Sequence, residues 1–258
     1  MKEQFQKVGY YIDPALIDPA KIAAAHAAVI RIFTGGGDIT SPARIVPSPA
    51  NRNVMTRIDQ PHLVDDAIKS LVWDRNIAAV AAHLFGVSAV QVWYAHALFK
   101  PPKHERSHVG WHTDGQYADF FLDDFVTAWI PLCSVSIAGG TLTYVQGTHK
   151  QALPRVSGFS SSKAFAEQTA TARSLVGVTW TEVPVTGSVG LVSFHHSRLL
   201  HGSSPNGSKS PRVSLTIHFR SERNVLRRPV QQNFVISALM DQMCCPVVLG
   251  ESSMLDMP

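Results

Sequence analysis

The sequence predicts an α+β fold in which N-terminal helices cover the outside of a β-sandwich or barrel. Two observations support this prediction. Helical patterns fill the first third of the chain, and most of the rest carries short runs bounded by Gly, Pro or Asn that are typical of strands. Helices and strands segregated in this way along a chain usually form separate layers around one core. With 258 residues and no internal repeat, the chain fits a single domain, residues 1–258.

Three helices are expected in the N-terminal part. An Ala-rich run over residues 20–33 follows Asp18-Pro19 and stops before three consecutive glycines. A second helix is expected over residues 63–71. A third begins after Asp74, whose carboxylate can cap it, and ends at Gly86. These helices are the elements expected on the outside of the sheets.

Strands are expected in the second part, with one long interruption. The expected strands are residues 90–99, 125–132, 141–145, 189–194 and 213–219. Residues 151–181 form a Ser- and Ala-rich segment that is too long for a plain hairpin loop, and such segments often act as lids or binding loops. Phe159 is an apolar residue inside this expected lid.

Composition is that of an ordinary globular protein, with 45% hydrophobic and 16% charged residues. No apolar run approaches the roughly 20 residues of a membrane helix, and the N-terminus lacks a signal-peptide pattern. Three cysteines do not make a disulfide framework, so a reducing cytoplasm is expected. The net charge is +4, and four arginines lie close together in the sequence: Arg220, Arg223, Arg227 and Arg228. For this cluster, charge exposed to solvent is favoured over a nucleic-acid contact.

The residues that carry chemistry begin with His112 and Asp114. Side chains two residues apart on an extended strand project from the same face, so this imidazole and carboxylate converge. A second histidine from a distant strand, His201, would complete a two-His, one-carboxylate facial triad, the ligand set of non-haem Fe(II) oxygenases. Arg212 follows eleven residues after His201 and offers the bidentate cation that a dicarboxylate co-substrate needs.

Further motifs occur around these residues in a fixed order. They are His112–Tyr117, Trp129–Leu132, Gly139–Lys150 and Phe194–Ser203, followed by Asn206 and Arg212. Because these motifs occur in this order, the chain resembles the phytanoyl-CoA dioxygenase family of Fe(II)/2-oxoglutarate-dependent oxygenases. The resemblance runs from about Met55 to Phe219. The resemblance implies a double-stranded β-helix core of the jelly-roll or cupin-like kind, within about residues 55–220.

The resemblance also implies a reaction. Fe(II) held by His112, Asp114 and His201 would use O2 and 2-oxoglutarate to oxidise a C–H bond of a small or medium-sized metabolite, releasing succinate and CO2. The intact Asp114 disfavours halogenation, because halogenating relatives replace this carboxylate with a small residue. Hydroxylation, desaturation, epoxidation, ring formation and epimerisation all remain open.

Binding roles follow from the same resemblance. Arg212 would grip the distal carboxylate of 2-oxoglutarate, and the residues expected to line that part of the site are Trp129, Arg57, Ser203 and Ser214. The residues expected toward the substrate are Gln116, Tyr117, Phe121, Phe159 and His195. On the last strand, Arg212, Ser214, Thr216 and His218 share one polar face, which the metal motif places in the barrel lumen rather than in water.

The sequence leaves two other functions to compare with an oxygenase. His104 to His108 spells HExxH, the signature of zinc hydrolases, but Pro101-Pro102 before it and Gly110 after it leave no room for the helix that this signature requires. A cupin-like binding or regulatory protein without turnover is the other alternative. The expected partner is a small-molecule substrate, with no nucleic acid and no membrane, and the protein is expected to be a monomer or a homodimer.

Overall fold

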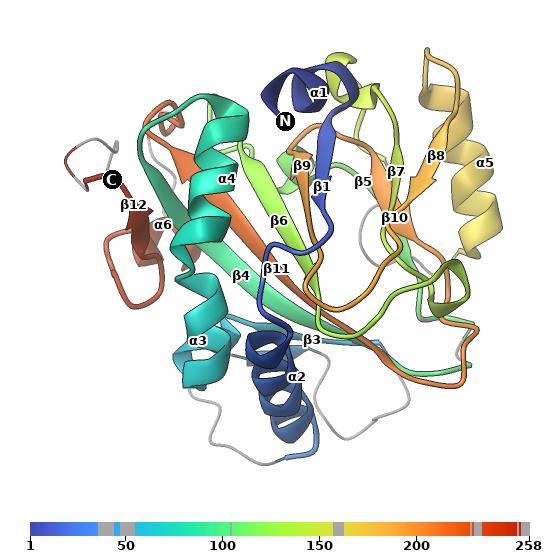
Figure 1. Cartoon of the computed structure of the whole chain (residues 1–258). Helices are drawn as coiled ribbons and strands as arrows, with labels where there is room; N and C mark the ends of the chain where they lie inside the picture. The colour runs from blue at the N-terminus through green and yellow to red at the C-terminus, as the bar shows by residue number, and fades with distance from the viewer. Residues whose placement is uncertain are drawn as a thin grey trace.

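The computed structural model describes residues 1–35, 44–46, 55–103, 105–156, 163–227, 229, 234–251 and 253. His104, Phe159 and Arg228, which the sequence singled out, lie outside the described residues. Figure 1 shows strands in the middle of the molecule with the helices α2, α3 and α4 on one side of them. None of the helices in the described ranges combines the length and the hydropathy needed to cross a bilayer.

Two antiparallel sheets form the core, as the prediction of a double-stranded β-helix requires. The large sheet runs in the order β1 (Tyr10–Asp13), β9 (Val192–His196), β6 (Val126–Pro131), β11 (Arg212–Ser221), β4 (Val90–Lys100), β3 (Thr56–Asp59) and β2 (Arg44–Val46), with β12 (Val247–Leu249) also paired to β4. The small sheet runs in the order β5 (Val109–His112), β10 (His201–Ser203), β7 (Thr143–Val145) and β8 (Glu182–Pro184). All five predicted strands are therefore present.

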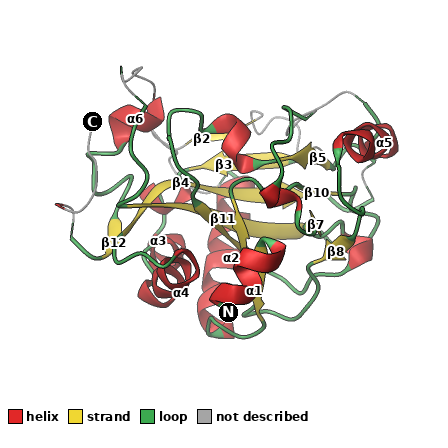
Figure 2. Ribbon diagram, turned by 90° about the horizontal axis from the view of Figure 1, so that it is seen from above, coloured by secondary structure: helices red, strands yellow, loops and turns green. Residues whose placement is uncertain are grey.

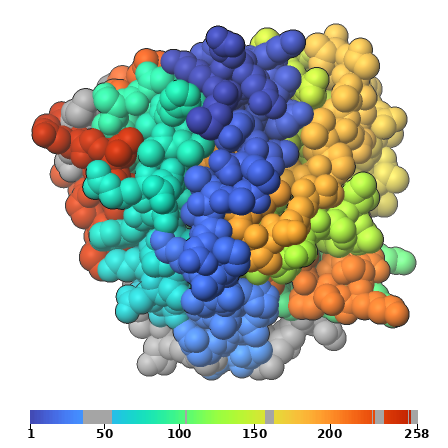
Figure 3. Space-filling view, viewed as in Figure 1, coloured from blue at the N-terminus to red at the C-terminus, as the bar shows by residue number. Residues whose placement is uncertain are grey.

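Helices cover the outer face of the large sheet (Figures 1 and 2). They are α1 (Lys2–Val8), α2 (Pro19–Phe33), α3 (Asp66–Val72) and α4 (Arg75–Phe85), while α5 (Phe165–Leu175) and α6 (Phe234–Ala238) lie later in the chain. In Figure 3 the N-terminal residues, in blue, run down the centre of this face beside α3 and α4. Short 3-10 turns, η1 (Pro61–Leu63), η2 (Asp114–Tyr117), η3 (Ile137–Gly139) and η4 (Thr148–Lys150), complete the described elements.

Aspartate caps explain where three of these helices begin. Asp18 accepts a hydrogen bond from Ala20 N at the start of α2, and Asp74 accepts from the first turn of α4. Gly86 ends α4 with φ +67°, a left-handed conformation that favours glycine. The second helix is shorter than predicted, because Asp65 caps it at Asp66 and the preceding residues form η1.

The strand β11 is buried on both faces, and the two faces differ in kind. Its apolar side chains, Val213, Leu215, Ile217 and Phe219, join one hydrophobic cluster with α2, α3 and α4. Its polar side chains point the other way, into the molecule, as the lumen prediction required. On the same strand, Arg220 is fully buried and donates from Nε to Gln91, so the prediction that it is a solvated charge was wrong.

The strand β1 was not predicted, and it closes one edge of the large sheet. It pairs with β9 in the register Tyr10↔His195 and Tyr11↔Phe194. The Tyr10 ring also stacks on Tyr144 of the small sheet, with centroids 5.0 Å apart. The N-terminal segment therefore contacts both sheets.

Phe194 tests the packing of this core. It is fully buried between β1 and β6, so we expect Phe194→Ala to lower the free energy of unfolding by about 3–5 kcal/mol through lost burial and a residual cavity. Urea denaturation measures the change. Ile137→Ala, at a side chain that is 66% exposed, is the control and should stay within about 0.5 kcal/mol of wild type. Equal effects of the two substitutions would contradict this assignment of the core.

Candidate active site

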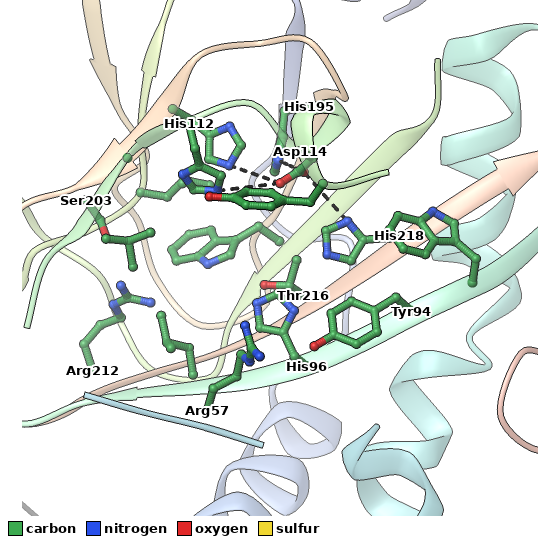
Figure 4. Close-up of a pocket in the computed structure, with 18 of the residues that line it drawn as sticks. Arg57, Tyr94, His96, His112, Asp114, His195, Ser203, Arg212, Thr216 and His218 are labelled. Carbon is green, nitrogen blue, oxygen red and sulfur yellow. Dashed lines mark hydrogen bonds and ion pairs between the residues drawn. The ribbon is translucent and has the colours of Figure 1, made fainter. Parts of the chain in front are cut away.

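A cavity of about 390 Å³ lies between the two sheets. Figure 4 shows His112 and Asp114 at one side of it and Arg212, Arg57 and His96 at the opposite side. Residues of β5 and β10 from the small sheet, and of β3, β4, β6, β9 and β11 from the large sheet, line this space. Both sheets are needed to build the site.

The three predicted metal ligands converge here. His112 ends β5 and His201 begins β10, and the two residues are direct partners in the sheet register. Asp114 starts the 3-10 turn η2 after an extended Thr113, so it still projects to the same side as His112. Its Oδ1 lies 3.7 Å from His112 Nε2 and 3.5 Å from His201 Nε2. One ion with bonds of about 2.0–2.2 Å can span such separations.

Backbone contacts fix the tautomer of both histidines. His112 Nδ1 donates to Gly110 O and His201 Nδ1 donates to Leu199 O, each at 2.8 Å. With the proton on Nδ1, the Nε2 lone pair faces Asp114 and is available to a metal. Burial, followed by the neighbouring His201, lowers the pKa of His112 to about 3, so this imidazole is neutral at neutral pH.

The second carboxylate oxygen of Asp114, Oδ2, is held in place by hydrogen bonds. Oδ2 accepts hydrogen bonds from Thr127 Oγ1 at 2.6 Å and from His195 Nε2 at 3.0 Å, which leaves Oδ1 facing the two histidines. Burial alone would raise the pKa of Asp114. The interaction with His201 and the hydrogen bond from His195 outweigh it and hold this pKa well below the ordinary value. The carboxylate is therefore ionised and presents one oxygen.

His195 belongs to a longer buried chain of hydrogen bonds. Tyr144 OH lies 3.2 Å from His195 Nδ1 and 2.7 Å from Ser193 Oγ. Because Nε2 of His195 donates to Asp114, Nδ1 accepts from Tyr144, and Ser193 in turn donates to Tyr144. The structure thus places His195 on the cavity wall and also behind the carboxylate, a position that sequence reasoning did not foresee.

The donor set fits a non-haem iron site. Two imidazole nitrogens and one carboxylate oxygen lie within 4.8 Å of one another, and all three residues are buried. Among the described residues this is the one group of three or more potential ligands. Nitrogen and oxygen ligands without thiolate, on one side of an ion, are those of Fe(II) facial-triad enzymes.

The opposite end of the cavity fits an anion. Arg212 is 4% exposed, donates from Nη1 to Ser214 Oγ at 2.7 Å, and lies over the Trp129 ring at 5.7 Å. Its buried Nε has no hydrogen-bond partner among the described residues, which a carboxylate would supply. Burial lowers the pKa of Arg212 to about 10, so the guanidinium remains charged at neutral pH.

Lys100 is a residue that sequence reasoning missed in this region. Its buried Nζ donates to Ser203 Oγ at 2.6 Å and to Ser204 O at 2.7 Å, and Gly140 O lies 3.2 Å away. Arg212 Nη2 reaches the same Gly140 oxygen at 3.3 Å. A side chain at Gly140 would meet Ser204 O at 2.4 Å, so only glycine fits there. Lys100 therefore ties together the loops beside Arg212.

The predicted substrate residues divide between two surfaces. Tyr117, 42% exposed, lines the cavity beside Phe120. Gln116 and Phe121 line a neighbouring groove instead, and a role for either residue in binding substrate stays a prediction. The cause is the 3-10 turn η2, which directs Gln116 away from Tyr117, while Phe121 packs in a hydrophobic cluster with Trp93.

The described part of residues 151–181 is docked against the small sheet. In α5, Thr169 Oγ1 accepts a hydrogen bond from Trp111 Nε1 at 2.8 Å, and Phe165 stacks on the same indole at 5.7 Å. Trp111 precedes His112, so this helix supports the strand that carries a metal ligand. That the segment acts as a lid stays a prediction.

The zinc-hydrolase alternative finds no support in the geometry. Residues 105–108 are turn and irregular structure, whereas the HExxH signature requires a helix. His108 Nε2 instead contacts Gln168 Nε2 at 2.9 Å, and His108 is not part of the group of potential ligands.

Comparisons with known proteins agree with this site. A family model described as phytanoyl-CoA dioxygenase matches residues 5–214. A probable alpha-ketoglutarate-dependent hypophosphite dioxygenase of Stutzerimonas stutzeri is 31% identical over 173 residues, 64% of this chain and 57% of that relative. The match thus spans little more than half of the relative's length. An ectoine dioxygenase of Bordetella parapertussis is 25% identical over 88% of this chain and 76% of its own.

Solved structures give the same fold. The epimerase SnoN, solved in complex with Fe3+, alpha-ketoglutarate and nogalamycin RO, superposes with a TM-score of 0.67 at 24% identity. The superposition covers 91% of this chain and 87% of SnoN. At this identity the likeness concerns the fold.

Metal binding tests the triad. We expect Asp114→Ala and His201→Ala each to weaken Fe(II) binding by at least about tenfold while the fold persists, because each removes one of three protein ligands. Anaerobic Fe(II) titration measures the affinity, and circular dichroism checks the fold. His108→Ala is the matched control and should bind Fe(II) like wild type. Wild-type affinity in either triad variant would remove the assignment.

The hydrogen bond behind Asp114 is tested separately. We expect His195→Leu to lower Fe(II) affinity by about 10–100-fold, because Oδ2 loses a donor and the carboxylate loses its fixed orientation. His195→Gln can still donate from its amide and should recover most of the affinity. If Leu and Gln give the same affinity, the hydrogen bond does not position Asp114.

Proposed function

This chain belongs to the phytanoyl-CoA dioxygenase family of Fe(II)/2-oxoglutarate-dependent enzymes, and we propose that it hydroxylates a small metabolite at a C–H bond, releasing succinate and CO2. One observation carries the proposal. Two histidines and a carboxylate meet at one side of a cavity whose other end holds a buried arginine suited to a dicarboxylate. We propose a single domain over residues 1–258 with its core in about 55–220.

The protein residues would contribute binding, orientation and a dry cavity. Bound Fe(II) and 2-oxoglutarate supply the activation of O2 and the electrons released by decarboxylation. His112, His201 and Asp114 Oδ1 would hold the metal on one side and leave its other positions open. Their hydrogen bonds to backbone carbonyls and to His195 keep these ligands in place before the metal arrives.

Arg212 would bind the distal carboxylate of the co-substrate. Its buried Nε, which has no hydrogen-bond partner among the described residues, can bind a carboxylate together with the guanidinium nitrogens near Ser214 and Gly140. The Trp129 ring covers the guanidinium and limits water there. Ser203, held by Lys100, lies on the cavity wall between Arg212 and His201 and would be a hydroxyl contact to the same molecule.

Cavity size supports a small substrate. About 390 Å³ is near the lower end of ligand pockets, and this space would have to hold both 2-oxoglutarate and the substrate. The relatives are named for hypophosphite and ectoine, both small molecules, and we propose a substrate of that size for this chain. Those two compounds are the first to assay.

Turnover distinguishes an oxygenase from a cupin-like binding protein. Purified protein with Fe(II), ascorbate and O2 should convert 2-oxoglutarate to succinate, slowly alone and faster with a substrate. Asp114→Ala should abolish the conversion. Protein that binds Fe(II) and 2-oxoglutarate but forms no succinate with any substrate would favour the non-catalytic alternative.

We also propose a cytoplasmic protein that acts as a monomer or homodimer, without nucleic-acid or membrane partners. The support is chemical: Cys133, Cys244 and Cys245 are all free thiols, as in a reducing compartment. Size-exclusion chromatography with light scattering gives the oligomeric state.

The co-substrate assignment predicts a defined defect in one variant. We expect Arg212→Lys to raise the 2-oxoglutarate requirement by about tenfold with little change in melting temperature, because Lys lacks the bidentate fork and one charge-assisted hydrogen bond is lost. The Fe(II)–2-oxoglutarate charge-transfer band, titrated without O2, measures the affinity. Arg198→Lys, at an exposed side chain, is the control. An unchanged affinity in Arg212→Lys would exclude Arg212 as the anchor.

A further inference from the structure

We propose that His218 and Thr216 bind a hydroxyl group of the substrate, so that the substrate of this enzyme is a small alcohol. This inference rests on the function proposed above and names the class of molecule that the same cavity accepts. Four observations carry it: the position of His218 on its strand, the proton on its ring, the hydroxyl of Thr216 and the aromatic rings around His218.

The strand β11 separates His218 from the co-substrate end of the cavity. Arg212, Thr216 and His218 all lie on its inner face and line the cavity. His218 is six residues from Arg212, which corresponds to about 20 Å along a strand. Figure 4 shows these two side chains well apart. In the register, His218 is the partner of Thr127, which donates to the metal ligand Asp114. A carboxylate held by Arg212 is therefore at the other end of the cavity from His218.

Hydrogen bonding fixes which nitrogen of His218 carries the proton. Thr127 gives its one hydroxyl hydrogen to the ionised Asp114 Oδ2 at 2.6 Å, so it accepts from His218 Nδ1, which lies 2.9 Å away. Burial brings the pKa of His218 to about 4, so Nε2 holds no proton at neutral pH and is an acceptor. No described residue forms a hydrogen bond with Nε2, which is not fully buried on the cavity wall.

The hydroxyl of Thr216 supplies a donor beside this acceptor. Thr216 is 7% exposed, lines the cavity, and forms no side-chain hydrogen bond with the described residues. Residues two apart on one face of a strand are about 7 Å apart, and one oxygen with hydrogen bonds of about 2.8 Å on each side spans a comparable length.

Of the simple polar groups, a hydroxyl suits this pair of residues. It can donate to His218 Nε2 and accept from Thr216 Oγ1 at the same time. A ketone only accepts, so it leaves Nε2 without a partner. An ammonium only donates, so it leaves the Thr216 hydroxyl hydrogen without an acceptor. The two side chains therefore select an alcohol.

Aromatic rings around His218 favour an alcohol with a small apolar carbon frame. The Tyr94 ring stacks on His218 with centroids 5.6 Å apart, and the Trp93 ring lies 5.1 Å from it. The register between β4 and β11 skips Trp93, and this bulge turns the indole to the inner side of the sheet. Phe120 packs edge-on against Trp93 and also lines the cavity. The carbon atoms next to the hydroxyl would pack on these rings.

The experiment uses the anaerobic enzyme loaded with Fe(II) and 2-oxoglutarate, and probes of matched size. They are cyclopentanol, cyclopentanone and cyclopentylamine, which is an ammonium at neutral pH. Calorimetry measures the affinity for each probe, and the Fe(II)–2-oxoglutarate charge-transfer band measures co-substrate binding. We expect cyclopentanol to bind at least about fivefold more tightly than either other probe, because each of them loses one hydrogen bond.

Variants of His218 separate substrate binding from support of the metal ligand. His218→Asn keeps a donor near the Nδ1 position for Thr127 but has no group at the Nε2 position. Cyclopentanol should bind this variant at least about fivefold more weakly, while Fe(II) affinity changes less than about twofold. His218→Gln carries its amide near the Nε2 position, where the oxygen can accept, and should recover most of the affinity for cyclopentanol.

A second position keeps the test decisive if His218→Asn folds poorly. Thr216→Val is nearly isosteric and removes the hydroxyl, so it should weaken cyclopentanol binding by about fivefold and leave 2-oxoglutarate affinity within about twofold of wild type. Thr171→Val, at an exposed side chain of α5, is the matched control and should bind cyclopentanol like wild type.

The inference would be overturned if wild type did not prefer the alcohol, or if both His218→Asn and Thr216→Val bound cyclopentanol like wild type. A loss of 2-oxoglutarate affinity in Thr216→Val would also overturn it, because that residue would then belong to the co-substrate. Failure of the proposed function looks different, because wild type would then give no charge-transfer band with 2-oxoglutarate.

Discussion

The constraint on which this structure depends is that the central strands of the large sheet have no solvent face. The strand β11 buries all ten of its residues. One side is apolar and packs under the helices, which is the ordinary hydrophobic solution. The other side is polar, and buried polar groups are costly unless they are paired. Several groups satisfy the polar side chains on that side. They are the second sheet, the metal-binding residues, and the metal and co-substrate that these residues would hold.

The polar side is arranged in zones along the strands. Near Asp114, the hydroxyl of Thr127 and the imidazole of His195 stabilise a carboxylate. Near Arg212, the hydroxyl of Ser214 and a backbone carbonyl take up part of a guanidinium. Acceptor and donor zones at opposite ends suit a molecule that binds a metal with one end and a cation with the other.

The sequence predicted those parts of the site that local spacing encodes. His112 and Asp114 are two residues apart, and Arg212 is eleven residues after His201, so pattern alone identified them. Gln116 lies on a neighbouring groove because two-residue alternation ends with the strand, and η2 rotates the residues that follow Asp114. Asp114 itself kept its side only because Thr113 stays extended.

The sequence did not predict the residues that reach the site from distant strands. Thr127 and Tyr144 contact the site through pairings between distant strands, and no local motif marks either residue. Lys100 gave a signal that was overlooked, since it shares alternation with Tyr94, His96 and Leu98 on the inner face of β4. The N-terminal strand β1 was missed because four residues, Tyr10–Asp13, carry too short a pattern to distinguish a strand from a loop.

That short strand links residues 10–13, which are far from the metal ligands in the sequence, to the reactive centre. Tyr10 lies opposite His195 in the sheet and against the Tyr144 ring; His195 donates to Asp114, and Tyr144 donates to His195. The scaffold behind the metal ligands therefore joins three residues that are far apart in the sequence, Tyr10, Tyr144 and His195. The centre can be assembled only when both ends of this span are present, so its maturation is coupled to completion of the fold.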